Sequence, residues 1–549
     1  SASRDHAVLL RRDEGWFICD TGSKSGVLVN GKKIEDRKLV SIGDTITMGS
    51  TTLTMWNADQ KPLERRRFFT GFSREAASPL RLMLAATFPL LLVALQGLCM
   101  DGELHPEQLI PFAAVLVMGW GLYIFSIGVM HRVSFEIETV AFLLSGIGVQ
   151  LLSAFDIEGI TTQLAAMLLG MLLFCFMIWF MGDMDRVAKC RLWIGLGAIL
   201  LLGATLVLGT NTYGSTNWIR IGPLSVQPSE FVKIAFIFVG TSTLDRLQTK
   251  KNIGEFLIFT GACIGLLALM PDFGMALILF ATFLIIAFMR SGSVRTIALV
   301  LAGAVLAVLV VLTVKPYVLD RFMGWGHVWE HINDNLGYSQ TRTLTYLASG
   351  GLFGVGLGNS YLASVFAADS DLVFGLLCEE QGLLMGMAVL FALVLFILYA
   401  RSDVTRSRST FYAIAACAVS GMLLFQAALN VFGPTDVLPL TGVTLPFISA
   451  GGSSMISVWG LLAFLKASDE RTYAARRAGR HPKGEADEDT ISFTPPRYSP
   501  NDPPTPQPRM NTRAENTAPR SRGTYRVHIS EENLSPGQSR TRRKDGDRR

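Results

Sequence analysis

From Pro79 to Lys466 the chain passes through a series of apolar stretches, and each is long enough to cross a lipid bilayer. Backbone N–H and C=O groups cannot stay unpaired in hydrocarbon, so these stretches must be helical. Twelve spans are expected, at residues 79–99, 108–130, 137–155, 161–181, 191–209, 229–245, 254–270, 273–289, 295–314, 371–399, 410–431 and 444–465. The sequence therefore predicts an all-α polytopic membrane protein over most of its length.

Composition supports this class. Hydrophobic residues make up 50% of the 549 residues and charged residues only 17%, against roughly 25% charged residues in a typical soluble domain. Seven cysteines are present and none forms a C-x-x-C pair, so no zinc site is expected. No signal peptide is expected before the first domain. The chain does not begin with methionine, and we expect its first residues to be missing.

The connections between spans predict the orientation. Short connections at 100–107 and 156–160 carry acidic residues and no Lys or Arg. Lys and Arg gather in the alternate connections, at 130–132, 183–191, 245–251, 290–295 and 401–408. Basic connections stay on the cytoplasmic side of the cytoplasmic membrane. Both termini are therefore expected in the cytoplasm, and two large loops, 210–228 and 315–370, on the outer face.

Polar regions flank the membrane part. Residues 1–60 alternate short β-rich runs with turns, which indicates a small all-β sandwich. Its strands are expected at residues 7–10, 16–19, 27–29, 45–48 and 52–56. A basic linker follows at 61–78. Residues 468–549 are rich in Pro, Ser, Thr and Arg and are predicted to form a disordered cytoplasmic tail, whose basic residues could contact anionic membrane lipids.

The β-rich region carries four short motifs in order: Ser3-Arg4-Asp5-His6, Gly22-Ser23-Lys24-Ser25-Gly26, Val29-Asn30-Gly31 and Gly43-Asp44. This order resembles the forkhead-associated (FHA) domain, although Ser25 stands where that family usually has Asn. The resemblance implies that Ser3, Arg4 and Ser23 bind phosphothreonine, with the Arg guanidinium as a charge-assisted fork. It also implies a phosphothreonine-containing partner protein and a Ser/Thr kinase in the same pathway. A degenerate FHA-like fold that no longer binds phosphate is the alternative.

Ionisable residues at or inside the membrane edge are costly and mark candidate functional sites. One group surrounds the start of the sixth span: Trp218, Arg220, Gln227, Ser229, Glu230 and Lys233. Capping explains part of this group, since Pro228 suits a first helical turn and Glu230 complements the helix N-terminus. A second group occupies the later outer loop and the tenth span: Arg321, Glu330, Asp334, Arg342, Asp371 and Glu380.

Several motifs that include these residues follow one another along the chain: Gln227-Pro228-Ser229-Glu230 with Lys233, Pro271-Asp272-Phe273-Gly274, the glycine-rich run 349–359, Ser370-Asp371 with Glu379-Glu380, and the blocks 438–442 and 445–454. They resemble the SEDS (FtsW/RodA/SpoVE) family over roughly residues 135–467. That family has ten spans, and the Q-P-S-E motif follows the third. Residues 79–134 are therefore expected to add two transmembrane helices, as a topological adaptor.

The resemblance implies a peptidoglycan glycosyltransferase. It would polymerise lipid II into β-1,4 glycan strands in cell division, elongation or sporulation. An α-linked donor and a β-linked product require inverting displacement of undecaprenyl pyrophosphate, with a carboxylate base and cations near the leaving group. Asp334 is the expected catalytic residue, and Glu330 is its alternative. Substrate or pyrophosphate binding is expected from Trp218, Arg220, Gln227, Ser229, Glu230, Lys233, Arg321, Arg342, Asp371 and Glu380.

Other interpretations stay open. The basic residues of this set could instead form structural salt bridges to Glu230, Asp371 or Glu380. The block 446–454 is expected to let helices pack closely through small residues. A divalent cation, Mg or Mn, is a candidate cofactor, and a class B penicillin-binding protein is the partner that the resemblance implies; nothing points to nucleic acid. A lipid II flippase and a non-catalytic FHA scaffold are the alternative functions, although no internal repeat typical of transporters is visible.

Overall fold

The computed structural model describes residues 7–54, 78–291 and 324–469, each with short gaps, and residues 298, 301–302, 472 and 529–530. The chain divides into two compact units, Ser1–Gly71 with Ile491–Arg549, and Phe72–Thr490. Several expectations lie outside the described residues: Ser3, Arg4, Ser23, Arg321, most of the span at 295–314, and the tail at 473–528 and 531–549.

The N-terminal unit is an all-β sandwich, as predicted. One sheet has the order β11-β1-β2-β5 and the other β4-β3-β6-β7. Both sheets contribute to one apolar core, which consists of Ile18, Val27, Val29, Ile34, Val40 and Ile46. The strands are β1 (Ala7–Arg12), β2 (Gly15–Asp20), β3 (Val27–Val29), β4 (Lys32–Lys33), β5 (Arg37–Val40), β6 (Thr45–Met48), β7 (Thr51–Thr54) and β11 (Ile529–Ser530). Strands β4, β5 and β11 were not expected from the sequence.

Two motif residues of this unit bind each other across neighbouring turns. Asn30 adopts a left-handed backbone conformation (φ 53°), and its Nδ2 donates to Asp44 Oδ1 at 2.7 Å. Asp44 Oδ2 accepts from the Ser41 N–H at 2.8 Å, and Asn30 Oδ1 accepts from the Thr45 N–H at 2.9 Å. The Ser41 N–H and then the Asn30 amide lower the pKa of Asp44. The V-N-G and G-D motifs thus fix the loop geometry of the sandwich.

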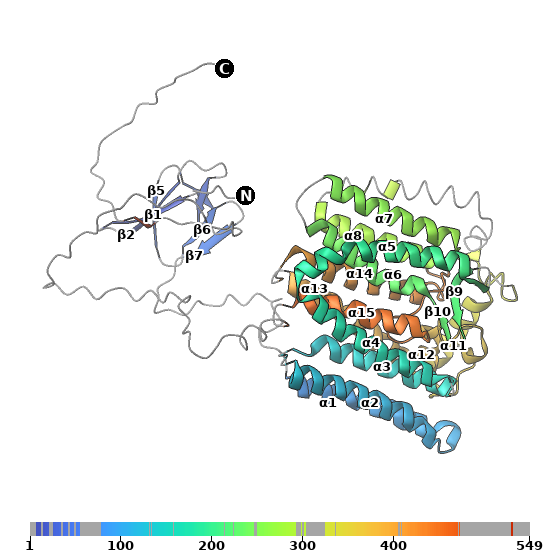
Figure 1. Cartoon of the computed structure of the whole chain (residues 1–549). Coiled ribbons are helices and arrows are strands. Elements are labelled where there is room, and N and C mark those ends of the chain that lie inside the picture. The colour runs from blue at the N-terminus through green and yellow to red at the C-terminus, as the bar shows by residue number, and fades with distance from the viewer. Residues whose placement is uncertain are drawn as a thin grey trace. The chain divides into compact units, whose positions relative to one another are not determined.

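The second unit is a bundle of long helices (Figure 1). Among the described residues, eight helices are long and apolar enough to cross a membrane. This confirms a multi-pass membrane protein. The helices are α1 (Pro79–Leu98), α2 (Leu109–Ile124), α3 (Glu136–Phe155), α4 (Ile160–Met181), α5 (Met184–Leu208), α6 (Pro228–Asp245), α7 (Lys250–Leu269), α8 (Phe273–Ser291), α11 (Tyr338–Gly350), α12 (Val373–Gln381), α13 (Leu383–Val404), α14 (Thr410–Phe432) and α15 (Gly452–Ser468).

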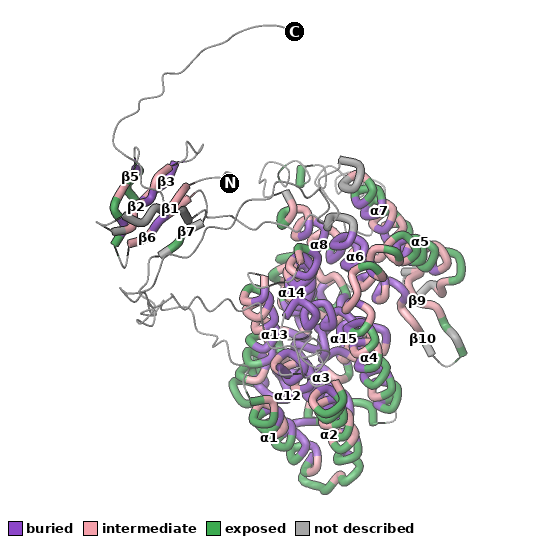
Figure 2. The backbone as a smooth tube through the Cα atoms, turned by 60° about the vertical axis from the view of Figure 1, so that its left-hand side comes forward, coloured by how far each residue is buried: buried purple, intermediate pink, exposed green. Residues whose placement is uncertain are grey.

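Helices α3, α14 and α15 form the interior of the bundle, and α1, α2 and α5 lie at its edge (Figure 2). Within the most apolar window, 83% of α3 is buried but only 22% of α5. Small residues allow the inner helices to approach closely. A Cβ on Gly170 of α4 would lie 2.9 Å from Trp459 Cβ of α15, and one on Gly148 of α3 would lie 2.7 Å from the Ile448 backbone. The second contact agrees with the expected packing role of block 446–454.

Two expected spans differ from the structure. The stretch 371–399 is not one helix, because it breaks at Gly382 into α12 and α13. Gly382 has φ 84° and ψ 165°, a conformation that is essentially restricted to glycine. The stretch 444–465 is helical only from Gly452, and the preceding residues 440–451 form turns and irregular backbone.

The glycine-rich run 350–358, which we call the glycine-rich turn, pairs with this helix break. Backbone groups freed by a break need partners at membrane depth, and loop backbone supplies them here. A Cβ on Gly354 (φ 83°) would lie 2.1 Å from the Glu380 carbonyl oxygen, so the close approach requires glycine. The four bonds run from Val355 N to Glu379 O (2.9 Å), Gly356 N to Glu380 O (3.0 Å), Leu383 N to Gly351 O (3.0 Å) and Leu384 N to Leu352 O (3.3 Å).

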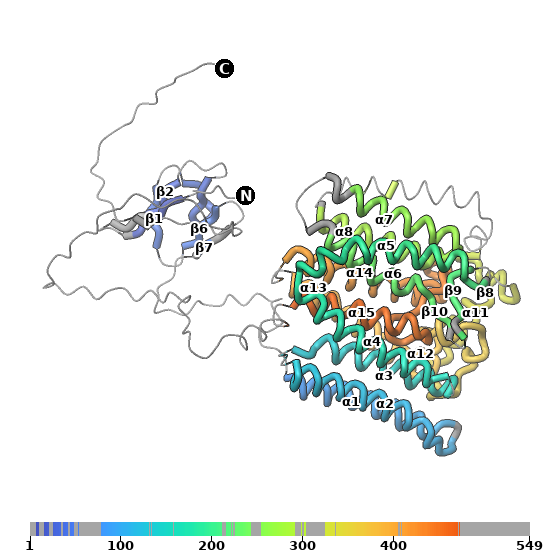
Figure 3. Tube along the Cα trace, viewed as in Figure 1, coloured from blue at the N-terminus to red at the C-terminus, as the bar shows by residue number. Residues whose placement is uncertain are grey.

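The predicted loops contain regular structure that the sequence reading missed. Residues 210–226 form a three-stranded sheet of β8 (Thr210–Thr212), β9 (Ser215–Ile221) and β10 (Leu224–Val226), with β9 in the centre. The later loop contains turns over 324–337 and then α11. As Figure 3 shows, β9, β10, α11 and α12 gather at one end of the bundle. The expected outer-face motifs therefore share one end of the membrane unit.

Candidate active site

The Q-P-S-E motif begins helix α6 and directs its polar side chains into the bundle. Pro228 occupies the first helical position, where a missing N–H costs nothing. Ser229 and Glu230 are buried, and Lys233, one turn later, has no exposed surface. The backbone N–H of Gln227 donates to Ser453 Oγ of α15 at 3.0 Å. The start of α6 is thereby fixed to the start of α15.

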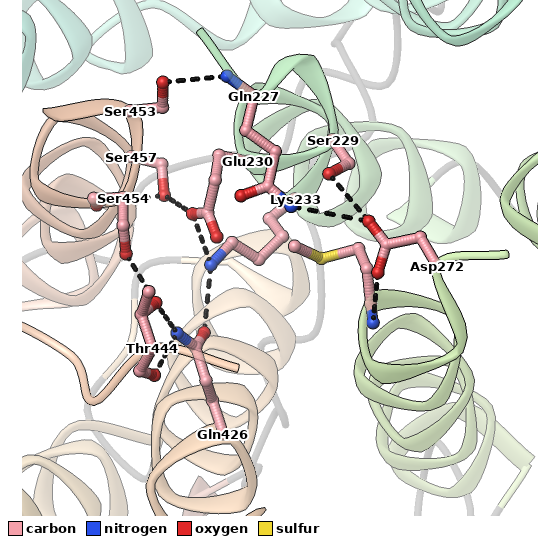
Figure 4. A network of polar contacts seen from close by, with 11 residues as sticks. Gln227, Ser229, Glu230, Lys233, Asp272, Gln426, Thr444, Ser453, Ser454 and Ser457 are labelled. Atoms are coloured by element: carbon pink, nitrogen blue, oxygen red, sulfur yellow. Dashed lines mark hydrogen bonds and ion pairs between the residues drawn. The ribbon is translucent and has the colours of Figure 1, made fainter. Parts of the chain in front are cut away.

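Glu230 and Lys233 form a buried ion pair (Figure 4). Lys233 Nζ lies 2.7 Å from Glu230 Oε2 and donates to Gln426 Oε1 of α14 at 2.9 Å. Ser457 Oγ of α15 also donates to Glu230 Oε2, at 2.7 Å. The pair is the salt bridge that the alternative interpretation anticipated. Its charges are enclosed and hydrogen-bonded, as a buried pair requires.

The polar network continues from α14 to the segment before α15. Gln426 Nε2 donates to the Thr444 carbonyl oxygen at 2.8 Å and lies 3.1 Å from Thr444 Oγ1. Thr444 Oγ1 and Ser454 Oγ are 2.8 Å apart. The irregular segment 443–451 is therefore held by side chains from two helices. This contact orients Gln426 toward Lys233.

Asp272 accepts hydrogen bonds from three elements, and Figure 4 shows those from Gln227 and Ser229. Its Oδ2 accepts from Asn217 Nδ2 of β9 at 3.1 Å, and more weakly from Gln227 Nε2 and Ser229 Oγ, each at 3.4 Å. Its Oδ1 accepts from the Met275 N–H at 3.1 Å, which caps α8. Burial is the main influence on Asp272 and raises its pKa. The carboxyl group thus connects the outer sheet to the starts of α6 and α8.

The two residues of the E-E motif, Glu379 and Glu380, lie in different environments. The Glu379 carboxylate accepts hydrogen bonds from the backbone N–H groups of Tyr361 and Leu362, at 2.9 and 3.0 Å, and from Ser360 Oγ. It therefore fixes the loop that follows the glycine-rich turn. Glu380 is 3% exposed, and among the described residues its Oε2 has no hydrogen-bond partner. The backbone of Gly358 hydrogen-bonds to the Glu380 carboxylate.

Asp371 lies near the segment that precedes α15. Its Oδ2 is 3.0 Å from the position that a Cβ on Gly442 would occupy. Asn430 of α14 donates to the carbonyl oxygens of Ser370, Asp371 and Val443 at 3.3, 3.1 and 2.7 Å. Asn430 therefore joins the S-D motif to the block around residue 443.

The two candidate catalytic carboxylates lie on exposed turns. Asp334 has a side chain that is 69% exposed, and its Oδ2 lies 3.3 Å from His331 Nδ1. Glu330 is 73% exposed and lies 3.3 Å from His327 Nδ1. Each carboxylate thus has an imidazole three residues earlier. Both are accessible to a substrate from solvent, unlike the buried Glu230.

The remaining predicted residues are spread over the end of the bundle that carries the outer motifs. Arg220 is exposed on β9, and Trp218 is half-buried on the same strand. The Arg342 guanidinium of α11 lies 5.3 Å from the centre of the Tyr338 ring, a cation–π distance. The structure therefore places Gln227, Ser229, Glu230 and Lys233 in one network, and it does not bring Asp334 or Glu330 into that network.

Sequence reasoning missed several members of this network. Gln426 and Asn430 are one helical turn apart in the apolar helix α14. Polar residues in such a helix are rare, and the rule that selected Glu230 would have found them. Asp272 was part of a quoted motif but was not assigned a role. Ser453 and Ser454 lie in the block 446–454, which indicated only packing, and Ser457 follows that block and was not singled out.

A cavity of about 220 Å³ lies between the end of α3, the start of α4 and residues 450–452. Asp156, Gln163 and Asp369 contribute its polar lining. Burial, with a smaller contribution from Asp156, raises the pKa of Asp369. Two carboxylates repel an anion, so this cavity is unsuited to pyrophosphate. Among the described side chains, no three of the His, Cys, Asp and Glu type gather as a metal site.

Comparison with known proteins identifies relatives of both parts. The family model of the FtsW/RodA/SpoVE proteins, described as "Cell cycle protein", matches residues 129–473, and the FHA domain model matches residues 1–49. A protein of Coxiella burnetii named "Probable peptidoglycan glycosyltransferase FtsW" is 36% identical over 270 residues, which cover 47% of this chain and 72% of that protein. A protein of the same name from Buchnera aphidicola of Acyrthosiphon pisum is 31% identical over 271 residues, covering 47% and 67% of the two chains.

A solved structure shares the fold. One chain of "Structural coordination of polymerization and crosslinking by a peptidoglycan synthase complex" matches with a TM-score of 0.53 and 24% identity, and the match covers 60% of this chain and 96% of that chain. The family model covers well over half of the present sequence, including every motif of the buried network. The chain therefore belongs to the FtsW/RodA/SpoVE family.

Proposed function

We propose that this chain is a peptidoglycan glycosyltransferase that polymerises lipid II on the outer face of the cytoplasmic membrane. Family membership and the names of the relatives support this activity. The observation that carries the catalytic assignment is the exposure of Asp334. Its carboxylate lies in a turn outside the membrane-spanning helices, with 69% of its side chain accessible. A lipid-linked sugar can reach this group without entering the bundle.

The proposed reaction is a single inverting displacement. The 4-hydroxyl oxygen of the acceptor sugar attacks the anomeric carbon of the donor and forms the new β-1,4 bond. The bond between that carbon and the pyrophosphate oxygen breaks, and the leaving group keeps the electron pair. Asp334 accepts the hydroxyl proton, as a general base within hydrogen-bond reach would. His331, 3.3 Å from Asp334, is placed to orient the carboxylate.

Cationic side chains are needed where negative charge develops on pyrophosphate. Among the described residues, Arg220 and Arg342 are the candidates. Arg220 is exposed and Arg342 is half-buried, so a solvent-borne pyrophosphate group can reach both. Lys233 has no exposed surface and is held by Glu230 and Gln426, so its role in the proposal is to organise the bundle beneath the reaction site.

Orientation and partners complete the proposal. The distribution of Lys and Arg among the connections supports a cytoplasmic location for both termini in this proposal. A class B penicillin-binding protein would crosslink the strands that this chain makes. The FHA domain would bind, through Ser3, Arg4 and Ser23, a protein that a Ser/Thr kinase of the same pathway has phosphorylated on threonine.

The decisive experiment measures glycan strands made from purified lipid II by the detergent-solubilised protein, alone and with its transpeptidase. Wild type is expected to make strands, and Asp334→Asn is expected to lose at least about 100-fold in rate, the lower range of a general base's contribution. The neighbouring Asn333→Ala is the matched control, because Asn333 is exposed in the same turn and has no assigned role.

The other outcomes select among the alternatives. If Asp334→Asn still makes strands and Glu330→Gln does not, the general base is Glu330 and not Asp334. If wild type makes no strands with or without its partner, a flippase assay with labelled lipid II in vesicles becomes the next test. Loss of cell-wall growth on deletion of residues 1–60, with Asp334→Asn fully functional in cells, would favour the scaffold.

A further inference from the structure

The α1–α2 hairpin, residues 79–129, packs tightly against the family core. A Cβ on Gly146 of α3 would lie 2.7 Å from the Leu90 side chain of α1. A Cβ on Gly119 of α2 would lie 2.2 Å from the Phe142 ring of α3. Large side chains thus fit against glycines in both directions across the interface. Such contacts hold helices at a fixed distance.

Buried hydrogen bonds reinforce the same interface. Gln150 Nε2 of α3 donates to the Leu90 carbonyl oxygen of α1 at 3.1 Å. Gln108, just before α2, and Ser153 of α3 exchange two bonds: Gln108 Nε2 donates to the Ser153 carbonyl oxygen at 3.0 Å, and Ser153 Oγ donates to Gln108 Oε1 at 2.8 Å. In an apolar environment each broken bond would leave an unpaired polar group. The hairpin is therefore built into the membrane unit and is more than a connecting segment.

The end of the hairpin between α1 and α2 contacts the glycine-rich turn. A Cβ on Gly97 would lie 3.2 Å from Leu357 Cδ2, and one on Gly358 would lie 2.8 Å from Met100 Sδ. Met100 and Leu357 are 9% and 3% exposed. The Met100 side chain thus fills the space that the missing side chain of Gly358 leaves.

The glycine-rich turn is also the segment whose backbone hydrogen-bonds to the residues at the break between α12 and α13. Val355 and Gly356 donate to the carbonyl oxygens of Glu379 and Glu380, and Gly358 reaches the Glu380 carboxylate. A shift of the turn would therefore move backbone that is bonded to both acidic residues.

We propose that the α1–α2 hairpin positions the glycine-rich turn, with Met100 as the positioning residue, and so fixes the geometry of the Glu379–Glu380 pair. Met100 acts through the turn and touches no substrate. In its consequence for glycan synthesis the proposal rests on the proposed function. Its structural part does not, which allows the two to be tested separately.

The structural test is hydrogen exchange of the full chain in detergent, measured by mass spectrometry on peptides that cover residues 351–358. Met100→Ala is expected to speed exchange of the Val355 and Gly356 amides several-fold, because the turn loses its support. Leu92→Ala is the matched control on α1, since Leu92 is 48% exposed and lies in the interior of that helix, before the segment that contacts the turn. Met100→Leu, which restores the volume, is expected to return the exchange to the wild-type rate.

The functional test is lipid II polymerisation by the same variants. Met100→Ala is expected to lower kcat several-fold while leaving the thermal midpoint close to that of Leu92→Ala, and Met100→Leu is expected to recover the rate. Unchanged exchange in Met100→Ala overturns the positioning role outright. Faster exchange with an unchanged kcat overturns its link to synthesis. If wild type is inactive, the proposed function fails, but the exchange experiment still tests whether the hairpin positions the glycine-rich turn.

Discussion

At the scale of single residues, Lys233 shows how a charge is kept inside an apolar bundle. Its ammonium group has two partners, Glu230 Oε2 at 2.7 Å and Gln426 Oε1 at 2.9 Å. The carboxylate has a further donor in Ser457. Removing one member leaves the other buried and uncompensated, which costs more than the pair contributes in stability.

Lys233→Met is therefore expected to destabilise the membrane unit by about 3 kcal/mol or more. Thermal unfolding of the purified protein in detergent measures this as a lower midpoint. The double variant Glu230→Gln/Lys233→Met is expected to unfold at a higher temperature than Lys233→Met, because no lone charge remains.

The control for this prediction is a partly exposed ion pair. Arg191 and Glu255 lie 3.3 Å apart, with side chains that are 25% and 45% exposed. Arg191→Met is expected to change stability by less than about 1 kcal/mol. Equal losses in Arg191→Met and Lys233→Met would contradict the role given to burial.

Asn30 provides a second prediction at this scale. Its side chain bonds Asp44 and Thr45, and its left-handed backbone suits Asn better than most residues. Asn30→Ala is expected to destabilise the N-terminal sandwich by about 1 to 2 kcal/mol. In calorimetry of the full chain, only the transition of the N-terminal unit should shift. A shift of the membrane unit alone would refute the assignment.

At the scale of elements, the joint between α12 and α13 depends on glycine. A Cβ on Gly382 would lie 2.3 Å from the Leu352 carbonyl oxygen, and the residue's φ of 84° strains any other side chain. Gly382→Ala is expected to cost at least about 2 kcal/mol and to reduce the yield of folded protein. Size-exclusion chromatography and thermal unfolding in detergent measure both effects.

Gly203→Ala is the matched control for the joint. Gly203 lies inside α5, and a Cβ there would meet no atom within 4 Å. Alanine favours a helix by up to about 1 kcal/mol over glycine, so this variant is expected to be as stable as wild type or slightly more stable. A similar loss in both variants would mean that the joint has no special need for glycine.

The elements also show what the sequence can predict. Spans such as α4 and α8 were found because lipid imposes a minimum apolar length, which is visible residue by residue. The break at Gly382 was missed because its backbone partners come from the glycine-rich turn, some 30 residues earlier in the chain. The network around Lys233 was found in part, through its charges. Gln426 was missed because only ionisable residues were selected, although a polar residue inside an apolar helix is a local signal as well. Which partners it binds depends on tertiary packing.

At the scale of the whole molecule, the native cysteines offer a test of orientation. Cys99 is exposed between α1 and α2. Cys190 is half-buried near the start of α5, and Cys19 belongs to the N-terminal sandwich. If both termini are cytoplasmic, a membrane-impermeant thiol reagent applied to intact cells should label Cys99. Cys19 and Cys190 should react only after lysis, and Cys99→Ser should abolish labelling of intact cells.

Mass spectrometry of the labelled peptides identifies each site. Labelling of Cys190 but not Cys99 in intact cells would reverse the orientation. It would also place Asp334 on the cytoplasmic side, where the proposed glycan synthesis could not supply the cell wall. The orientation test therefore bears on the function as well as on the topology.

The pairing between the glycine-rich turn and the α12–α13 joint also bears on biogenesis. The turn leaves the ribosome before the joint does, so the backbone that will pair with Glu379, Glu380, Leu383 and Leu384 has already been translated when those residues emerge. A discontinuous helix entering the bilayer needs such a partner at once, because lipid offers none. The order of these segments along the chain thus suits co-translational insertion, and a circular permutation that placed the turn after α13 would remove that advantage.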